Sequence, residues 1–70
     1  MAIEKVTLPV ARKIANLTQK QLGIAVGVSE STVANWEKGR TEPTVSQAKA
    51  IGEATGIAYD NIIFLTQNTV

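Results

Sequence analysis

The sequence predicts an all-α fold, a compact bundle of four to five short helices that contains a helix-turn-helix unit. The main observation is the stretch 19–36, in which two short helical patterns flank a glycine at position 27. Apolar residues recur at helical spacing on both sides of that glycine, and polar residues gather on the second pattern. The 70-residue chain is 44% hydrophobic, which is enough for one small domain with a compact core.

The first part of the chain contains an arm and then a helix. Residues 1–8 show no strong helical period, so we expect either an extended N-terminal arm or a short edge strand. Pro9 suits the first turn of a helix, where its missing N–H is not needed, and the first helix is expected over 9–15. Asn16 is expected to end this helix because asparagine tolerates the left-handed backbone region.

The helix-turn-helix unit has clear boundary signals. Thr18 is followed three residues later by a glutamine, which is capping-box spacing and predicts a helix over 19–26. Gly27 allows the left-handed conformation that a tight turn needs. Ser29 is a good N-cap for a second helix over 30–38. The apolar residues expected to hold these two helices in the core are Leu22, Val26, Val28, Val33 and Trp36.

The last third of the chain is expected to complete the bundle. The capping-box spacing recurs at Thr44, which predicts a fourth helix that ends at Gly56. We expect a last short helix over 59–64 and a polar tail at 66–70, so that the domain spans 9–65. The apolar residues expected to join the core from this part are Val45, Ala48, Ile51, Ala54, Ile57, Ile62, Ile63 and Leu65.

The composition argues against several classes of function. The chain has no cysteine and no histidine, which removes thiolate metal sites and the commonest general base and metal ligand. The carboxylates are scattered, and no glycine-rich phosphate loop is present. We therefore expect no enzyme activity, no cofactor and no metal. No apolar run approaches the roughly 20 residues of a membrane span, so we expect a cytoplasmic protein without membrane contact.

Four segments resemble the phage repressor and Cro-type helix-turn-helix proteins, the lambda-repressor-like XRE family. They read L-T-Q-K-Q-L-G at 17–23, G-V-S-E-S-T-V-A-N-W-E-K-G-R at 27–40, P-T-V at 43–45 and G-I-A-Y-D-N-I-I-F at 56–64. The resemblance covers most of the chain. It implies a bundle of four or five helices whose third helix, 30–38, lies in the major groove of DNA.

The resemblance also implies roles for individual residues. The positions that match base-reading residues are Glu30, Ser31 and Asn35. The positions that match DNA-backbone contacts are Gln19, Thr32, Lys38, Arg40 and Thr41. Arg12 and Glu37 match a partly buried structural ion pair between the first and third helices. Asn35 is the best single candidate for base reading, because asparagine can form two hydrogen bonds with adenine.

The implied function is a sequence-specific regulator of transcription that binds a double-stranded DNA operator as a homodimer. The dimer surface is expected in either the arm before Pro9 or the segment 62–65. Two features argue for a different class: Glu30 repels phosphate, and the net charge is only +1. The alternatives are a protein-interaction module, such as a phage antirepressor that binds a repressor-type partner, and an antitoxin-like subunit.

Each candidate residue also has a purely structural explanation. The polar residues of helix 30–38 can be an ordinary solvated face, and Lys38 and Arg40 can be ordinary solubilising charges. Gly23 stands where the resemblance leads us to expect alanine, and glycine at a helical position costs up to ~1 kcal/mol of helix propensity.

Overall fold

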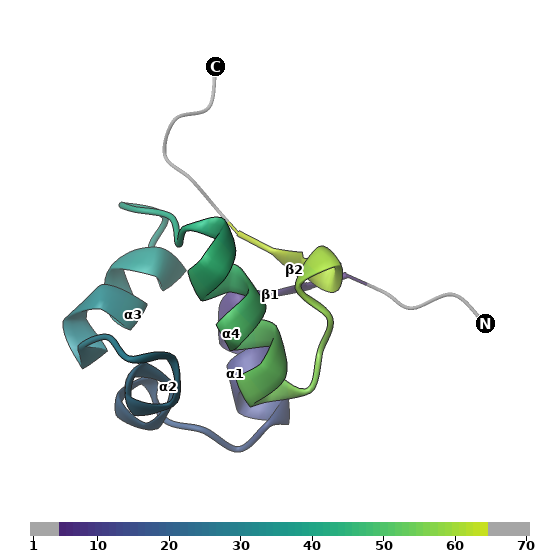
Figure 1. Cartoon of the computed structure of the whole chain (residues 1–70), viewed down its shortest axis with the longest axis horizontal. Coiled ribbons are helices and arrows are strands. Elements are labelled where there is room, and N and C mark those ends of the chain that lie inside the picture. Colours follow the sequence, from purple (N-terminus) through teal and green to yellow (C-terminus); the bar gives the residue numbers. More distant parts are fainter. Residues whose placement is uncertain (1–4, 65–70) are drawn as a thin grey trace.

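A computed structural model, which describes residues 5–64, shows four α-helices around one small core (Figure 1). The helices are α1 (Leu8–Ile14), α2 (Gln19–Val26), α3 (Glu30–Glu37) and α4 (Val45–Thr55). The other elements are the strands β1 (Val6–Thr7) and β2 (Ile62–Ile63) and a short 3-10 helix, η1 (Tyr59–Asn61). The predicted all-α fold class is confirmed, with α2 and α3 as the helix-turn-helix unit.

Two of the helices begin at the predicted capping boxes. The Gln21 N–H donates to Thr18 Oγ1 at 3.0 Å, and the Thr18 N–H donates to Gln21 Oε1 at 2.8 Å. The same exchange starts α4, where Thr44 and Gln47 are joined by bonds of 3.1 and 2.9 Å. Both helix starts therefore satisfy backbone N–H groups that have no acceptor within the helix.

The ends of α1 and α2 use the left-handed backbone region. Asn16 has φ of 60° and directly follows the C-cap of α1, as its tolerance for this region predicts. Gly27 has φ of 91°, which an L-residue adopts only with strain. The N–H groups of Gly27 and Val28 both donate to the Gly23 carbonyl oxygen, at 2.7 and 2.8 Å. The chain therefore turns tightly from α2 into the segment that precedes α3.

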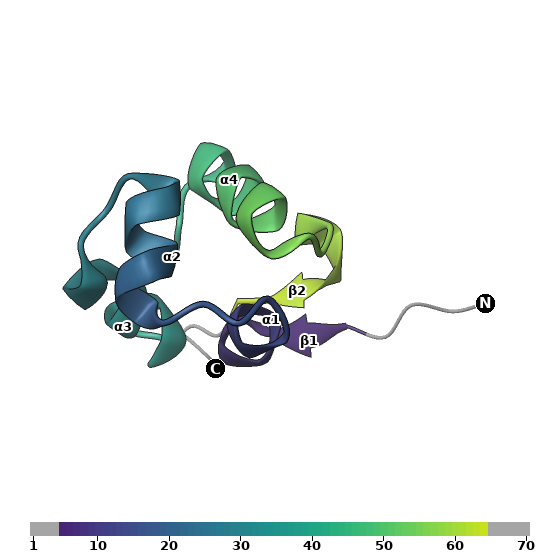
Figure 2. The ribbon, with the colours of Figure 1, turned by 90° about the horizontal axis from the view of Figure 1, so that it is seen from below.

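The core lies where the four helices meet, and α2 with α3 form one end of the bundle (Figure 2). Its buried residues are Leu8, Ala11, Leu22, Val33, Trp36, Ile51 and Ile62. Val26 and Val28 are partly buried against it, as expected for the helix-turn-helix unit. The prediction that Val45 and Ile63 lie in the core is wrong, because Val45 is 68% exposed and Ile63 is 41% exposed. Leu65 lies outside the described residues.

The predicted helix over 59–64 is also wrong. Only η1 is helical there, and β2 pairs in parallel with β1, with Val6 opposite Ile62 and Thr7 opposite Ile63. Isoleucine is β-branched and fits a pleated strand better than a helix, and an isolated helix of six residues is too short to be stable in water. The backbone partner supplied by β1 therefore determines the conformation of this segment.

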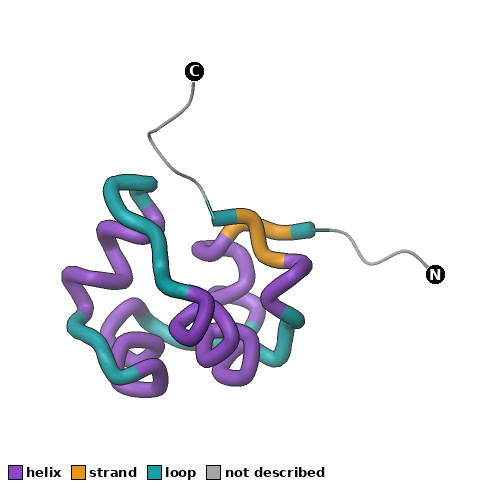
Figure 3. Tube along the Cα trace, turned by 45° about the horizontal axis from the view of Figure 1, so that its top comes forward, coloured by secondary structure: helices purple, strands orange, loops and turns teal. Residues whose placement is uncertain are grey.

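The pairing of β1 with β2 brings part of the expected arm into the packed structure. Val6 and Thr7 form an edge strand, one of the two forms that the sequence left open, and Leu8 is buried at the start of α1. Figure 3 shows the two strands side by side, away from α2 and the α2–α3 turn. The rest of the arm at 1–4 and the expected tail at 66–70 lie outside the described residues.

Candidate nucleic-acid interface

Helix α3 has one face fixed in the core and one face open to solvent. Val33 and Trp36 are buried, and their spacing of three places them on the same side of the helix. Glu30 and Ser31 are exposed, and Asn35 is half-buried. The three residues that the sequence predicts as base readers therefore share a helix whose opposite side is held by the core.

The N-terminal end of α3 is organised by Ser29 and Thr32. The Thr32 N–H donates to Ser29 Oγ at 3.1 Å, and the two hydroxyl oxygens lie 2.9 Å apart. The predicted N-cap is therefore confirmed. A hydrogen bond between two hydroxyls uses one of their two hydrogens, so the pair keeps one O–H that can donate to another group. This matters because Thr32 is a predicted phosphate contact.

The loop after α3 carries three of the predicted DNA-backbone contacts. Lys38, Arg40 and Thr41 are exposed in the segment that joins α3 to α4. The Arg40 N–H donates to the Asn35 carbonyl oxygen at 2.9 Å, which folds this loop back against the end of the helix. The open face of α3 is thus acidic at Glu30, where the helix begins, and basic just beyond its end.

A hydrogen-bonded network joins α1, α2 and α3. Arg12 Nε donates to Glu37 Oε2 at 2.6 Å, and the side chains of Arg12 and Glu37 are only 13% and 9% exposed. Gln19 Nε2 donates to Glu37 Oε1 at 2.9 Å. Arg12 Nη1 donates to the Leu17 carbonyl oxygen at 2.9 Å. The structure has the expected ion pair and adds Gln19 to it, a contact that sequence reasoning missed.

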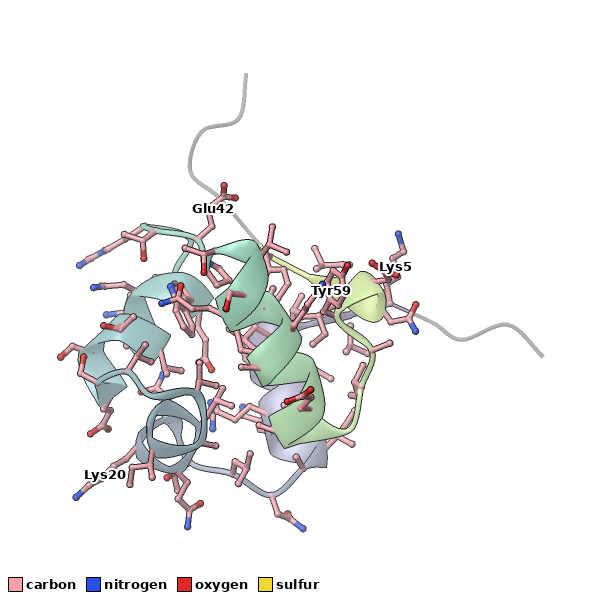
Figure 4. The ribbon with its side chains drawn as sticks, viewed as in Figure 1. Lys5, Lys20, Glu42 and Tyr59 are labelled. Atoms are coloured by element: carbon pink, nitrogen blue, oxygen red, sulfur yellow. The ribbon has the colours of Figure 1, made fainter. Side chains whose placement is uncertain are left out.

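The remaining predicted backbone contact, Gln19, begins α2 and is followed by Lys20, an exposed cation. Lys20 points outward from α2, whereas Lys5 and Tyr59 lie beside the strands (Figure 4). Helices α2 and α3 pack directly on each other, so Gln19 and Lys20 belong to the same unit as the open face of α3. Lys20 therefore adds an exposed positive charge to the helix-turn-helix unit.

Two kinds of feature are absent from the part of the chain that the structure describes. Between residues 5 and 64, no group of three or more acidic, histidine or cysteine side chains could hold a metal ion. In the same range, no helix has the length and apolar character required to cross a membrane.

The fold and this surface define the class of the protein: a helix-turn-helix domain whose second helix presents a polar face. The chain matches the family described as helix-turn-helix over residues 10–62, and it belongs to that family, of the XRE type. It is 39% identical over 54 residues to an uncharacterized HTH-type transcriptional regulator of Methanothermobacter thermautotrophicus. That match covers 77% of this chain and 78% of the relative. Comparison with solved structures gives no significant match.

Proposed function

We propose that the protein is a DNA-binding regulator of transcription that recognises a specific double-stranded operator in the cytoplasm through α3. The observation that carries the proposal is the division of α3 into a buried face and an open polar face within a helix-turn-helix unit. An α-helix with its side chains is about 10–12 Å across, and the major groove of B-DNA is about 12 Å wide. The open face can therefore enter the groove while the core holds the helix from behind.

In this proposal, three side chains of α3 contact the bases. Asn35 offers a donor and an acceptor, the pair that matches adenine N7 and N6. Glu30 is an acceptor that suits the N4 amine of cytosine. Its side chain is exposed in the first turn of α3, so it is free to contact a base. Ser31 is exposed beside it and discriminates less, because a hydroxyl can both donate and accept. The proposal therefore predicts an operator half-site that contains both adenine and cytosine contacts.

Contacts to phosphate would set the register of the protein on DNA. The proposed contacts are Gln19, Thr32, Lys38, Arg40 and Thr41. They lie at the start of α2, near the start of α3 and just beyond the end of α3. Contacts at both ends of a helix can fix its position in a groove, whereas base contacts along it supply specificity.

Two copies of the chain on one operator are part of the proposal. The described parts of the two segments expected to form a dimer include β1 and β2, which pair with Thr7 opposite Ile63. Ile63 is exposed there, and Ile14, the last residue of α1, is 60% exposed. A second copy that covered either side chain would remove apolar surface from water. Half-sites for two such domains would lie about 34 Å apart.

A protein partner is the second candidate function. Two observations favour it: Glu30 places a negative charge at the start of α3, and Ile24 on α2 is 72% exposed. Neither residue type suits contact with DNA phosphate. In this alternative, the helix-turn-helix surface would bind a repressor-type protein, as an antirepressor does.

Selection from a random DNA duplex library, followed by titration, separates the two functions. The wild-type protein should enrich a two-fold-related sequence. Its binding constant should fall steeply with salt, by a log–log slope of about −0.9 for each phosphate that a lysine or arginine neutralises. Absence of binding to any duplex at low salt and high protein concentration would overturn the DNA-binding proposal and favour a protein partner.

A further inference from the structure

We propose that Glu37 is a positioning residue for DNA binding, which holds the Gln19 side-chain amide ready to donate to a DNA phosphate. This inference rests on the proposed function and deepens it. It starts from the bond of 2.9 Å between Gln19 Nε2 and Glu37 Oε1, which links the first residue of α2 to the last residue of α3.

The Glu37 carboxylate is itself tightly held. Arg12 donates to both of its oxygens, from Nε to Oε2 at 2.6 Å and from Nη2 to Oε1 at 3.3 Å. The guanidinium is fixed in turn by the bond from Nη1 to the Leu17 carbonyl oxygen. Each bond involves an ionised group and a side chain that is largely buried, so the carboxylate has little freedom to move. It is a rigid acceptor for Gln19.

The chemistry of the amide determines which of its atoms faces Glu37. A carboxylate only accepts hydrogen bonds, so the amide must present its nitrogen to Glu37. The amide nitrogen carries two N–H groups, and one bond to Glu37 leaves the second for another acceptor. Without Glu37, the Gln19 amide could equally turn its oxygen outward, where it would repel a phosphate. The bond also limits the motion of Gln19 before DNA arrives, which favours binding through preorganisation.

The network around Glu37 includes one side chain, Gln19, that the packing of the helices does not require. Arg12 already supplies a donor to each Glu37 oxygen, so the two charges compensate each other without Gln19. Gln19 contributes no charge and stays half-exposed at the start of α2. A role in presenting the amide accounts for its place in the network.

The test compares the effect of Gln19→Ala in two backgrounds. The first is the wild-type chain. The second carries Arg12→Met and Glu37→Met together, because a buried ion pair can often be replaced by apolar residues of similar volume without loss of stability. Circular dichroism should show that all four proteins are folded at the temperature of the binding assay. Dissociation constants are then measured on the operator selected with the wild-type protein.

If Glu37 acts through Gln19, Gln19→Ala should weaken binding about fivefold in the wild-type chain and less than about twofold in the Met/Met background. Arg12→Lys is the control, because it weakens the ion pair and keeps the Glu37 carboxylate. It should lower the melting temperature and leave the effect of Gln19→Ala near fivefold. Equal effects of Gln19→Ala in all backgrounds would overturn the positioning role alone. Failure of the wild-type protein to bind any DNA would overturn both the proposed function and this inference.

Discussion

The carbonyl oxygen of Val28 lies 2.7 Å from the point that a β-carbon would occupy at Gly23. The carbonyl carbon and oxygen of Ser29 lie 3.2 Å from the same point. All three atoms belong to the backbone of the segment between α2 and α3, so they cannot rotate away as a flexible side chain can. The absence of a side chain at Gly23 therefore allows this segment to lie close against α2.

We predict that Gly23→Ala destabilises the protein, although alanine is the better helix former. Helix propensity alone would favour alanine by up to ~1 kcal/mol. Overpacking against backbone costs about 1–3 kcal/mol, so the expected net loss is about 1 kcal/mol in the free energy of unfolding. Urea denaturation measures it. Ala25→Gly, at an exposed position of the same helix, reports the propensity effect alone. A more stable Gly23→Ala variant would show that the segment moves away at little cost.

Glu37→Ala should destabilise the fold far more than Glu42→Ala. The Glu37 carboxylate is 9% exposed and paired, and its removal leaves the Arg12 charge partly buried without its partner. Loss of one partner of a buried pair costs about 3 kcal/mol or more, which lowers the melting temperature by roughly 12–24 °C in a domain of this size. Glu42 is exposed in a loop, and its replacement should change stability by less than about 0.5 kcal/mol. Equal melting temperatures for the two variants would contradict the structural importance of the pair.

The features that the sequence predicts well are encoded by neighbouring residues. The capping boxes at Thr18 and Thr44 each need only a glutamine three positions later, and Asn16 needs only its own tolerance of a positive φ. The core positions Val33 and Trp36 follow from helical spacing. Short-range chemistry is sufficient for these features, and the structure confirms them.

The features that the sequence does not predict depend on partners far along the chain. Ile62 and Ile63 form a strand because β1, at the other end of the described chain, supplies the backbone partner. The bond from Gln19 to Glu37 joins residues 18 positions apart on different helices. A side chain at the start of one helix and a side chain at the end of another offer no local pattern for such a contact. The bond from Gln19 to Glu37 therefore depends on how α2 packs against α3, which the residues near either position do not determine.

Ile14→Ser should weaken assembly on an operator without unfolding the domain. Ile14 is 60% exposed, so its replacement removes little from the core. If it contacts a second copy, loss of that apolar contact should weaken binding to a two-half-site operator about tenfold. Binding to a duplex with a single half-site should be unchanged. Val45→Ser is the matched control, because Val45 is 68% exposed on α4. Equal behaviour of the two variants on both duplexes would exclude Ile14 from the dimer surface.

Asn35→Ala and Lys38→Ala should affect DNA binding in different ways. Asn35 sits on the open face of α3, where loss of a bidentate contact to adenine should cost about 1–3 kcal/mol on the selected operator and relax the preference at that base pair. Lys38 is exposed at the end of the helix, so its replacement should weaken binding to all sequences alike and reduce the salt slope by about 1.

Competition with operators that carry single base changes measures the sequence preference, and titration over a range of salt concentrations measures the slope. Asn35→Ala should keep the wild-type slope, because a neutral side chain releases no counterion from DNA. Lys38→Ala should keep the wild-type order of sequence preference, because phosphate contacts do not distinguish bases. The two readouts thus separate base reading from backbone contact within one helix and its end. If Asn35→Ala instead weakens binding to all sequences alike and leaves the sequence preference unchanged, Asn35 contacts the backbone, and the bases are read by other side chains of α3.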